Sequence, residues 1–303
     1  MKLLLYGSKG WIGQQFLDLC IKNNIKYTIG IERLESHKLK DEVIKSKCTH
    51  IVSMTGRTHG IYEKEYIGTI DYLEKPGKLV DNIRDNIFGP IRLANISKEL
   101  KLHYTYLGTG CIFDYDDNHL LNGKKGYNEN DIPNFFGSSY SIVKGFTDRL
   151  MHDYPQILNL RIRMPIIGTH NSRNFITKIT KYEKICSIPN SMSVLDELLP
   201  IMLDMVTKNI TGTINLTNPG VISHNEILTM YKKYIDPSFE WKNFTIEEQD
   251  KILLSKRSNN YLDTTKLQNM YPNVKHIMQS IDDLFKNWKT TNKLQRKMAK
   301  RWG

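Results

Sequence analysis

The first half of the chain alternates short apolar runs with longer stretches of helical pattern. The apolar runs fall at Lys2–Tyr6, Tyr27–Ile31, Thr49–Met54, His103–Leu107 and Leu158–Met164, and they lack strict polar–apolar alternation. Runs of this kind are typical of strands that are buried on both faces. Helical patterns lie between them at about 11–23, 36–47, 78–100 and 138–153. This alternation predicts an α/β fold, a Rossmann-type doubly wound parallel sheet covered by helices.

The second half is less regular. Ile214–Thr217 is predicted to be a further strand, and Ser223 and Glu226 have the spacing of a capping box that starts a helix. Residues 114–137 are rich in Asn, Asp and Gly, which predicts a long loop over the active site.

These patterns suggest two parts of unequal size. We expect residues 1–165 to form a dinucleotide-binding Rossmann domain and residues 166–303 to form mainly a smaller substrate-binding lobe. About residues 210–230 are expected to return to the Rossmann sheet. The lobe should close over the carboxyl ends of the strands, where open α/β sheets bind their ligands.

Charge and composition narrow the function classes. The 303 residues carry a formal charge of +11, but seven basic residues and no acidic ones lie in the last 20 residues. We interpret this tail as a solvated terminus, so no nucleic-acid partner is expected. No apolar run approaches the ~20 residues that span a bilayer, and no secretory leader is evident, which favours a cytoplasmic protein without a membrane partner. Four scattered cysteines without a C-x-x-C pair argue against disulfides and against a metal site.

A glycine motif follows the first predicted strand and opens the first predicted helix. Gly7, Gly10 and Gly13 frame this turn, together with Trp11 and Ile12. Glycines here permit a tight turn and close approach of the backbone to a pyrophosphate at the helix N-terminus. The G-x-x-G-x-x-G spacing is characteristic of short-chain dehydrogenases/reductases.

The end of the second strand should select the cofactor. Glu32 favours a free ribose hydroxyl, whereas Arg33 accommodates a 2′-phosphate. We expect NADPH, with NADH left open and with an exposed loop arginine as the alternative reading of Arg33. Thr55 and Pro165 are further expected cofactor contacts.

Tyr140 and Lys144 form a Y-x-x-x-K pair on a predicted helix. Positions four apart share a helix face, so the phenol and the ammonium can point into one site. The lysine would bind the cofactor ribose and lower the phenol pKa, and the tyrosine would exchange a proton with a substrate oxygen. Thr109, at the end of a strand, would bond the same oxygen, and Asn86 is the expected fourth member, unless it is a surface amide.

Cys111 suggests a second chemistry beside the first. Two residues from Thr109, its thiolate could abstract a proton next to a ketone. Inversion of a carbon also needs an acid on the opposite face, for which Lys178 is a candidate. From spacing alone, a buried apolar cysteine and a solvated lysine remain the alternatives.

Several long motifs resemble the nucleotide-rhamnose synthase/epimerase-reductases of plants. They are Gly7–Gly13, Thr109–Phe113, Tyr140–Lys144, Arg163–Pro165, Arg173–Lys178, Asn190–Pro200, Thr217–Glu226 and Arg257–Asn260 with Leu262-Asp263. The resemblance spans about residues 2–285. A composition rich in Lys, Asn and Ile suits a member from an AT-rich genome, such as a giant virus.

The resemblance implies conversion of UDP-4-keto-6-deoxy-D-glucose to UDP-β-L-rhamnose, by 3,5-epimerisation and then 4-reduction with NADPH. Cys111 and Lys178 would be the epimerase pair, and Thr109, Tyr140 and Lys144 the reductase set. Asn174 would contact the substrate, Arg257 would clamp its diphosphate and Trp241 would stack near the base; Arg57 would contact substrate or phosphate. A separate 4,6-dehydratase would supply the substrate, and a homodimer is the expected assembly.

Residues 53–56 and 59–81 depart from the plant pattern, which leaves the local shape of the pocket open. Two alternatives to the bifunctional enzyme also remain. A monofunctional reductase of dTDP- or UDP-4-keto sugars would not need Cys111 and Lys178. A non-catalytic Rossmann-fold subunit would have no use for Thr109, Tyr140 and Lys144 together.

Overall fold

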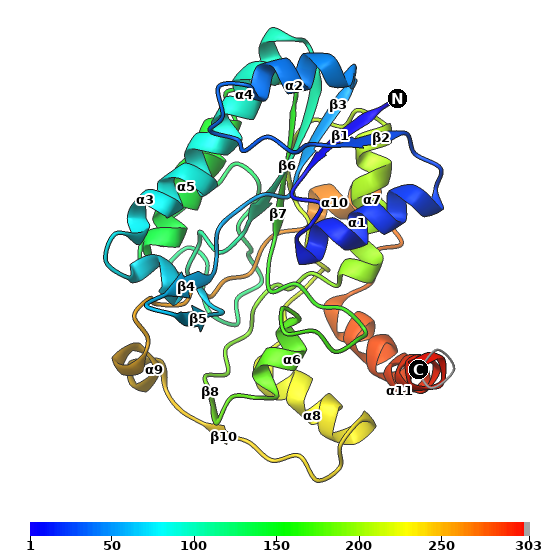
Figure 1. The fold of residues 1–303 in the computed structure, drawn as a ribbon. Coiled ribbons are helices and arrows are strands. Elements are labelled where there is room, and N and C mark those ends of the chain that lie inside the picture. Colours follow the sequence, from blue (N-terminus) through cyan, green and yellow to red (C-terminus); the bar gives the residue numbers. More distant parts are fainter. Residues whose placement is uncertain (300–303) are drawn as a thin grey trace.

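A six-stranded parallel sheet forms the centre of the computed structural model (Figure 1). The model describes the backbone of residues 1–299 and the side chains of residues 1–288. The strand order is β2-β1-β3-β6-β7-β9. The strands are β1 (Leu3–Tyr6), β2 (Tyr27–Ile29), β3 (His50–Ser53), β6 (His103–Thr109), β7 (Ile157–Ile162) and β9 (Gly212–Asn215). The predicted α/β class and parallel sheet are confirmed.

Helices cover both faces of the sheet, as Figure 1 shows. One face packs against α1 (Trp11–Lys22) and α7 (Leu195–Thr207), and the other against α2 (Leu39–Ser46), α4 (Gly89–Glu99) and α5 (Ser139–Met151). Successive residues of a strand point to opposite faces. Leu3 and Leu5 of β1 therefore join the core under α1 and α7, whereas Leu4 and Tyr6 join the core under α2 and α4.

The order of the strands determines where a ligand can enter. In the sheet, β2 lies on one side of β1, and β3 and the later strands lie on the other side. The carboxyl ends of β1 and β3 therefore lie at a topological switch point, where open α/β sheets form a crevice. Gly7 directly follows β1, and Thr55 lies two residues after the end of β3.

The predicted helix at 78–100 contains a local irregularity. It consists of α3 (Lys78–Ile83), a π-helical turn (Arg84–Phe88) and α4 in direct succession. The Thr147 hydroxyl, from α5, donates to the carbonyl oxygen of Asn86 inside this turn at 2.8 Å. Turns of this kind are frequent at functional sites, and here the turn carries Asn86.

A small hairpin occupies the segment that departs from the plant pattern. It pairs β4 (Gly60–Tyr62) with β5 (Glu65–Ile67) and leads into a 3₁₀ helix, η1 (Ile70–Glu74). Both residues between the strands, Glu63 and Lys64, have positive φ (48° and 69°). Two-residue hairpin turns require such angles, but they usually contain Asn or Gly, so this turn had no sequence signal.

The remaining elements build a lobe below the carboxyl edge of the sheet in Figure 1. They are α6 (Phe175–Ile179), β8 (Lys184–Ile185), α8 (His224–Tyr234), β10 (Lys242–Asn243), α9 (Ile246–Ile252) and α11 (Ile277–Ala299), and α10 (Thr265–Met270) lies beside β9. The predicted capping box of Ser223 and Glu226 is present at α8. Residues 114–137 contain no helix or strand, as expected for a loop.

Two predictions concern the C-terminal tail and membrane spans. The side chains of the basic tail from Lys289 onward lie outside the described residues, so the expected solvation of the tail stays a prediction. Within the part of the chain that is described, no helix has the length and apolar character needed to cross a membrane.

Candidate active site

The glycine turn has the shape that a pyrophosphate requires. Gly7 adopts a left-handed φ of 80°, and the Gly10 N–H donates to the Gly7 carbonyl oxygen at 3.0 Å. A Cβ on Gly13 would lie 2.0 Å from that same oxygen, and a Cβ on Gly7 would lie 2.8 Å from the backbone of Met54. No side chain caps α1, so its first N–H groups, beginning at Trp11 and Ile12, are free to bind an anion.

The end of β2 carries charges suited to a ribose or its phosphate. Arg33 is mostly exposed and pairs with Glu35 at 2.5 Å. The Glu32 carboxylate accepts from the Ser36 hydroxyl at 2.7 Å. The carboxylate of Glu42 accepts from the N–H of Ile31 at 2.8 Å, which fixes this turn against α2. Arg33 can therefore swing toward a 2′-phosphate at little cost, since its present ion pair is solvent-exposed.

Asn86 holds the loop after β3. Its Oδ1 accepts from the Arg57 N–H at 2.8 Å, and its Nδ2 donates to the Arg57 carbonyl oxygen at 2.8 Å. Asn86 is almost fully buried, so it is not a surface amide. The Arg57 side chain pairs with Asp85 at 2.8 Å, and the Thr55 hydroxyl bonds that of Ser53 at 2.7 Å. The structure thus joins Thr55, Arg57 and Asn86 at one edge of the crevice.

The predicted reductase residues lie together at the carboxyl end of β6. Thr109 ends this strand, and its hydroxyl accepts from the Cys111 N–H at 3.1 Å. Tyr140, on the first turn of α5, interacts with the Thr109 side chain and with the Cys111 thiol. Burial raises the pKa of Tyr140, and the positive charge of Arg173 opposes this shift. The helix start is fixed by Ser138, whose hydroxyl accepts from a backbone N–H.

Lys144 has a partner that the sequence did not reveal. Its ammonium donates to the hydroxyl of Tyr106 and lies 4.5 Å from the centre of that ring. Burial lowers the pKa of Lys144 to about 8, while the carboxylate of Asp148 raises it. Tyr106 therefore positions the lysine from β6, and no motif distinguished it from the other tyrosines.

A second group of polar residues faces this site from the lobe and from the loop after β3. Lys178, on α6, has a pKa lowered to about 8 by burial and by the nearby charges of Arg173 and Arg257. Arg173 donates to the Thr58 hydroxyl at 2.9 Å. His59 also lies close to Lys178; burial and the neighbouring cations lower its pKa to about 4, so it is neutral near pH 7. Arg173 and His59 were not among the predicted site residues.

The side chain of Asn174 is held within the protein framework. It was expected to contact the substrate, but it is fully buried and its amide is used by the framework. Its Nδ2 donates to the carbonyl oxygens of Ile167 and Thr169 at 2.9 and 2.7 Å. Its Oδ1 accepts from the N–H of Ile176, at the start of α6, and from the N–H of Ile167. No hydrogen-bonding position remains for a ligand. Asn174 instead shapes the segment that carries Lys178.

Pro165 lies three residues after the carboxyl end of β7 and contacts the segment that begins α6. Its carbonyl oxygen accepts from the Phe175 N–H at 3.1 Å. The preceding residue, Met164, has a left-handed φ of 41°, which is strained for a side chain of this kind. Backbone strain of this kind is frequent at functional sites, and here it lies next to a predicted cofactor contact.

Two further predicted contacts have partners of their own. Arg257 pairs with Asp71 at 2.5 Å and donates to the Ser255 carbonyl oxygen at 2.8 Å. Trp241 stacks on Phe239 and donates to the Asn225 side chain at 2.8 Å, at the outer end of the lobe. Arg257 acts on Lys178 and so belongs to the site region, whereas no described contact joins Trp241 to the other site residues.

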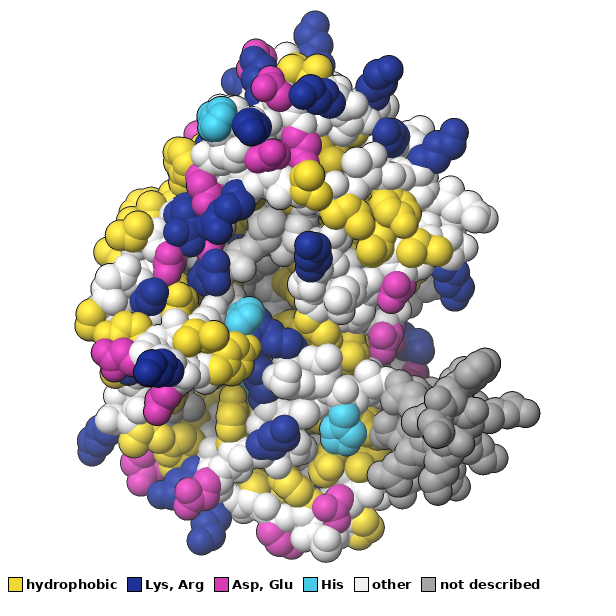
Figure 2. All heavy atoms as spheres, in the orientation of Figure 1, with side chains coloured by type: hydrophobic (Ala, Val, Ile, Leu, Met, Phe, Trp, Pro, Cys, Tyr) yellow, Lys and Arg dark blue, Asp and Glu magenta, His cyan; other side chains and the backbone are white. Residues whose placement is uncertain are grey.

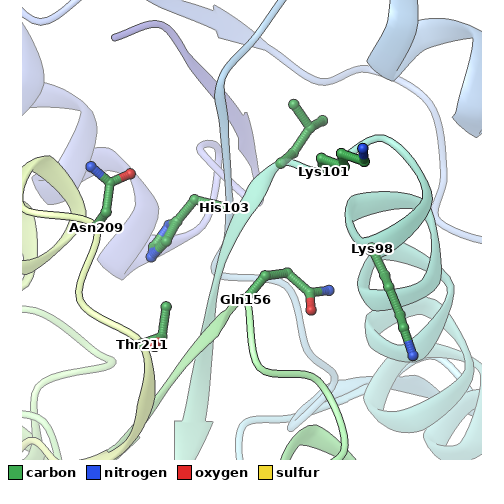
Figure 3. A pocket seen from close by; sticks show the side chains of 7 residues that line it. Lys98, Lys101, His103, Gln156, Asn209 and Thr211 are labelled. Carbon is green, nitrogen blue, oxygen red and sulfur yellow. The ribbon is translucent and has the colours of Figure 1, made fainter.

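The surface view agrees with this placement. Figure 2 shows a hollow in the middle of this face, with Lys and Arg side chains and a histidine at its rim. A separate hollow of about 330 Å³ lies at the amino end of β6 and is lined by residues that include Lys98, Lys101 and His103 (Figure 3). It lies at the opposite edge from the glycine turn and contains none of the predicted site residues. No metal-binding cluster occurs among the described residues.

Comparison with known proteins places the chain among sugar-nucleotide enzymes. The L780 protein of Acanthamoeba polyphaga mimivirus is 47% identical over 291 residues, covering 95% of this chain and 99% of L780. The crystal structure described as the L780 UDP-rhamnose synthase superposes with a TM-score of 0.90 at 48% identity, covering 94% of this chain and 99% of that one. A bifunctional dTDP-4-dehydrorhamnose 3,5-epimerase/dTDP-4-dehydrorhamnose reductase of Arabidopsis thaliana is 45% identical over 280 residues, covering 92% and 90%. No family model matches the chain.

A more distant structure shares the fold alone. The dTDP-4-dehydrorhamnose reductase of Bacillus anthracis, solved in complex with NADP, has a TM-score of 0.75 at 13% identity, covering 94% of this chain and 97% of that one. The glycine turn, the parallel sheet and the Tyr140–Lys144 pair define an extended short-chain dehydrogenase/reductase. The chain belongs within that class to the nucleotide-rhamnose synthase family of epimerase-reductases. The mimivirus relative fits the giant-virus origin suggested by the composition.

Proposed function

We propose that this chain is a bifunctional 3,5-epimerase/4-reductase that converts UDP-4-keto-6-deoxy-D-glucose to UDP-β-L-rhamnose. The observation that carries the proposal is that Arg173 neighbours both Tyr140 and Lys178, so that two sets of acid–base residues lie in one region. Thr109, Cys111 and Tyr140 lie at the end of β6 and the start of α5, and Lys178 lies on α6 of the lobe. A monofunctional reductase would need Thr109 and Tyr140 but not the thiol of Cys111.

The epimerase step uses the acidity that the 4-keto group gives to the hydrogens on C3 and C5. Cys111, as a thiolate, removes one of these protons, and the electron pair moves onto O4 to form an enolate. Thr109 and Tyr140 bind O4, where this negative charge develops. Lys178 then gives a proton to the opposite face of the carbon. A lysine whose pKa is about 8 is suited to this exchange near neutral pH.

The reductase step uses the same oxygen. NADPH, when bound, supplies the hydride that C4 receives. Tyr140 gives its proton to O4, and Lys144 stabilises the resulting phenolate by its positive charge. In the structure the Lys144 ammonium donates to the Tyr106 hydroxyl, which orients the ammonium.

The cofactor site supports a nicotinamide dinucleotide. The Gly7–Gly13 turn has no room for a Cβ at either end, and the N-terminus of α1 offers free N–H groups. Arg33 is an exposed arginine after the second strand, which is why we favour NADPH over NADH. The NADP bound to the Bacillus anthracis reductase is consistent with this choice.

The substrate must come from a dehydration at C4–C6 of a UDP-hexose, because that reaction creates the 4-keto-6-deoxy sugar. Trifunctional relatives of Arabidopsis thaliana combine a UDP-glucose 4,6-dehydratase with the two later activities. We therefore propose a 4,6-dehydratase as the functional partner that supplies the substrate.

We also propose a homodimer. Large apolar side chains remain exposed on the adjacent faces of α3 and α5, namely Leu79, Val80, Ile83, Phe146 and Leu150. Exposed apolar patches on helices often mark protein interfaces. Light scattering should give twice the chain mass, and Phe146→Glu should give a monomer. A monomeric wild-type protein would contradict the dimer.

The decisive experiment incubates the protein with UDP-4-keto-6-deoxy-glucose in deuterated water, with and without NADPH. Two deuterons per sugar, with UDP-rhamnose formed only when NADPH is present, would establish both activities. Cys111→Ala should lose the exchange at C3 and C5 and still reduce a ketone that is already epimerised. Reduction without exchange in the wild-type protein would make it a monofunctional reductase. If neither deuterium exchange nor UDP-rhamnose is observed, the proposal is refuted.

A further inference from the structure

The loop between β2 and α2 carries two side chains of opposite charge beside the glycine turn. The Gly30 N–H, at the start of this loop, donates to the carbonyl oxygen of Leu5 at 2.9 Å, two residues before Gly7. The loop continues with Glu32 and Arg33. In a Rossmann fold a carboxylate at this place binds the free ribose hydroxyls of NADH, and an arginine accommodates the 2′-phosphate of NADPH. The choice between the two cofactors therefore depends on which of these side chains is available.

Two helices hold the backbone of this loop. The Glu42 carboxylate, on α2, accepts from the N–H groups of Ile31 and Glu32 at 2.8 and 3.2 Å. Arg92, on α4, donates to the carbonyl oxygen of Ser36 at 3.0 Å. Because both ends of the loop are fixed in this way, selection between cofactors depends on the directions of its side chains and not on movement of its backbone.

The carboxylate of Glu32 is bound within the loop. The Ser36 hydroxyl accepts from the Lys38 N–H at 3.2 Å and donates to Oε2 of Glu32 at 2.7 Å. A hydroxyl has a single proton, so the proton of Ser36 is committed to this carboxylate. Glu32 has to give up this bond before both of its oxygens can turn to a ribose. Hydrogen bonds to ionised groups are the stronger ones, so this exchange reduces the affinity for a ribose without a phosphate.

Arg33 is held much less firmly. Its side chain is 66% exposed, and its Nε pairs with Glu35 at 2.5 Å. Glu35 also lies 3.7 Å from Arg84, in the π-helical turn. Arg33 can therefore leave its ion pair without stranding Glu35, because Arg84 remains beside that carboxylate. The loop thus offers its arginine to a ligand and retains its carboxylate.

We propose that Ser36 is a specificity-determining residue for the cofactor: by binding the Glu32 carboxylate, it leaves Arg33 as the charged side chain that meets the 2′ position, and so favours a dinucleotide with a 2′-phosphate. The inference rests on the proposed function and deepens it. Ser36 acts through Glu32 and needs no contact with the cofactor or the sugar.

Calorimetric titration with NADH and with NADPH tests this inference without any sugar substrate. Ser36→Ala frees the Glu32 carboxylate, which can then bind the ribose hydroxyls of NADH and repel the 2′-phosphate of NADPH. The preference for NADPH, measured as the ratio of the two dissociation constants, should fall about 10-fold, the size expected for one hydrogen bond to a charged group. Ser36→Thr keeps the hydroxyl and should keep the preference.

The chain offers a matched control in the lobe. The Ser238 hydroxyl donates to the Asp236 carboxylate at 2.6 Å, in an exposed segment after α8, far from β2 in Figure 1. Ser238→Ala removes a bond of the same kind and should leave both affinities unchanged. In a Glu32→Gln protein there is no carboxylate to free, so the addition of Ser36→Ala should not change the preference further.

An unchanged preference in Ser36→Ala would overturn the inference. An equal loss of both affinities would also overturn it, because Ser36 would then only maintain the shape of the loop. Glu32→Gln alone gives a test that does not depend on the Ser36 variant. NADH should bind to it as to the wild-type protein, whereas a loss of about 10-fold would mean that Glu32 already binds the ribose, which contradicts the inference.

Failure of the proposed function gives a different result. If the wild-type protein binds neither dinucleotide, the proposed cofactor site is refuted and this inference with it. If it shows the expected changes in preference but no turnover of the sugar, the inference is supported and the proposed reaction is refuted.

Discussion

The ion pair of Asp148 and Arg161 connects the catalytic helix to the sheet, and its removal should be among the most damaging single changes. Both side chains are almost fully buried. The guanidinium of Arg161, on β7, donates to the carboxylate of Asp148, on α5, at 2.9 and 2.6 Å. It also donates to the carbonyl oxygens of Asn128 and Glu129, in the loop at 114–137. One arginine thus fixes a helix, a strand and the predicted active-site loop.

Asp148→Asn keeps the shape of the side chain and removes the charge. Loss of one partner from a buried pair costs about 3–5 kcal/mol of unfolding free energy, because the other charge stays buried without compensation. For a chain of 303 residues, the usual entropy of unfolding per residue converts this loss into a fall of about 5–8 °C in Tm. The carboxylate also favours the charged form of Lys144, so its loss should lower the pKa of that lysine below its present value of about 8.

Two assays check these expectations. Calorimetry or chemical denaturation measures the loss of stability, with Glu99→Gln as the control, since Glu99 pairs with Lys40 on the surface and such pairs contribute at most about 1 kcal/mol. The pH profile of ketone reduction measures the second effect: the alkaline limb should move to lower pH, because Lys144 loses its proton earlier. A loss below about 1 kcal/mol, equal to the control, would refute the reasoning from buried charge.

Three further changes test single features of the structure. Gly13→Ala places a Cβ 2.0 Å from the Gly7 oxygen and should weaken NADPH binding at least ~10-fold by calorimetric titration, because the turn must open; unchanged affinity would contradict the cofactor site. Asn86→Ala removes both hydrogen bonds to the Arg57 backbone and should lower the unfolding free energy by about 2 kcal/mol in urea titration, whereas a surface amide would cost nothing. Ser223→Ala removes the cap of α8 and should lower the unfolding free energy by about 1 kcal/mol in the same titration; no change would mean that water replaces the cap.

Much of the fold could be predicted because local patterns determine it. The buried strands were visible as unbroken apolar runs, and the predicted helices at 11–23 and 138–153 correspond to α1 and α5 with ends shifted by one or two residues. The hairpin β4–β5 was not predicted, since Glu63 and Lys64 are not typical turn residues. The π-helical turn at Arg84–Phe88 also gave no signal in the sequence; one of its carbonyl oxygens, that of Asn86, accepts from Thr147 on another helix, a contact that local patterns do not reveal.

The candidate site likewise has a part that the sequence predicts and a part that it does not. The Gly7–Gly13 turn and the Tyr140–Lys144 pair could be found because each motif lies within one element and its geometry follows from spacing. The contacts that complete the site join residues that are far apart in the sequence, such as Arg173 with Thr58, 115 positions apart, and Arg257 with Asp71, 186 positions apart. Asn174 shows the converse: the motif was recognised, but only the structure reveals that its amide is used by the backbone.

These long-range contacts also explain how one ketone could serve two reactions. The groups that we propose to bind O4 lie on β6 and α5, which belong to the sheet and its covering helix. Lys178 lies on α6, a five-residue helix of the lobe, and Arg173, just before this helix, bonds Thr58 in the loop after β3. Epimerisation needs both sides of the crevice, whereas reduction needs only the sheet side and the cofactor. Weakening the contact between lobe and sheet, as in Thr58→Val, should therefore slow proton exchange more than reduction, and an equal loss of both would show that the two sides act as one rigid unit.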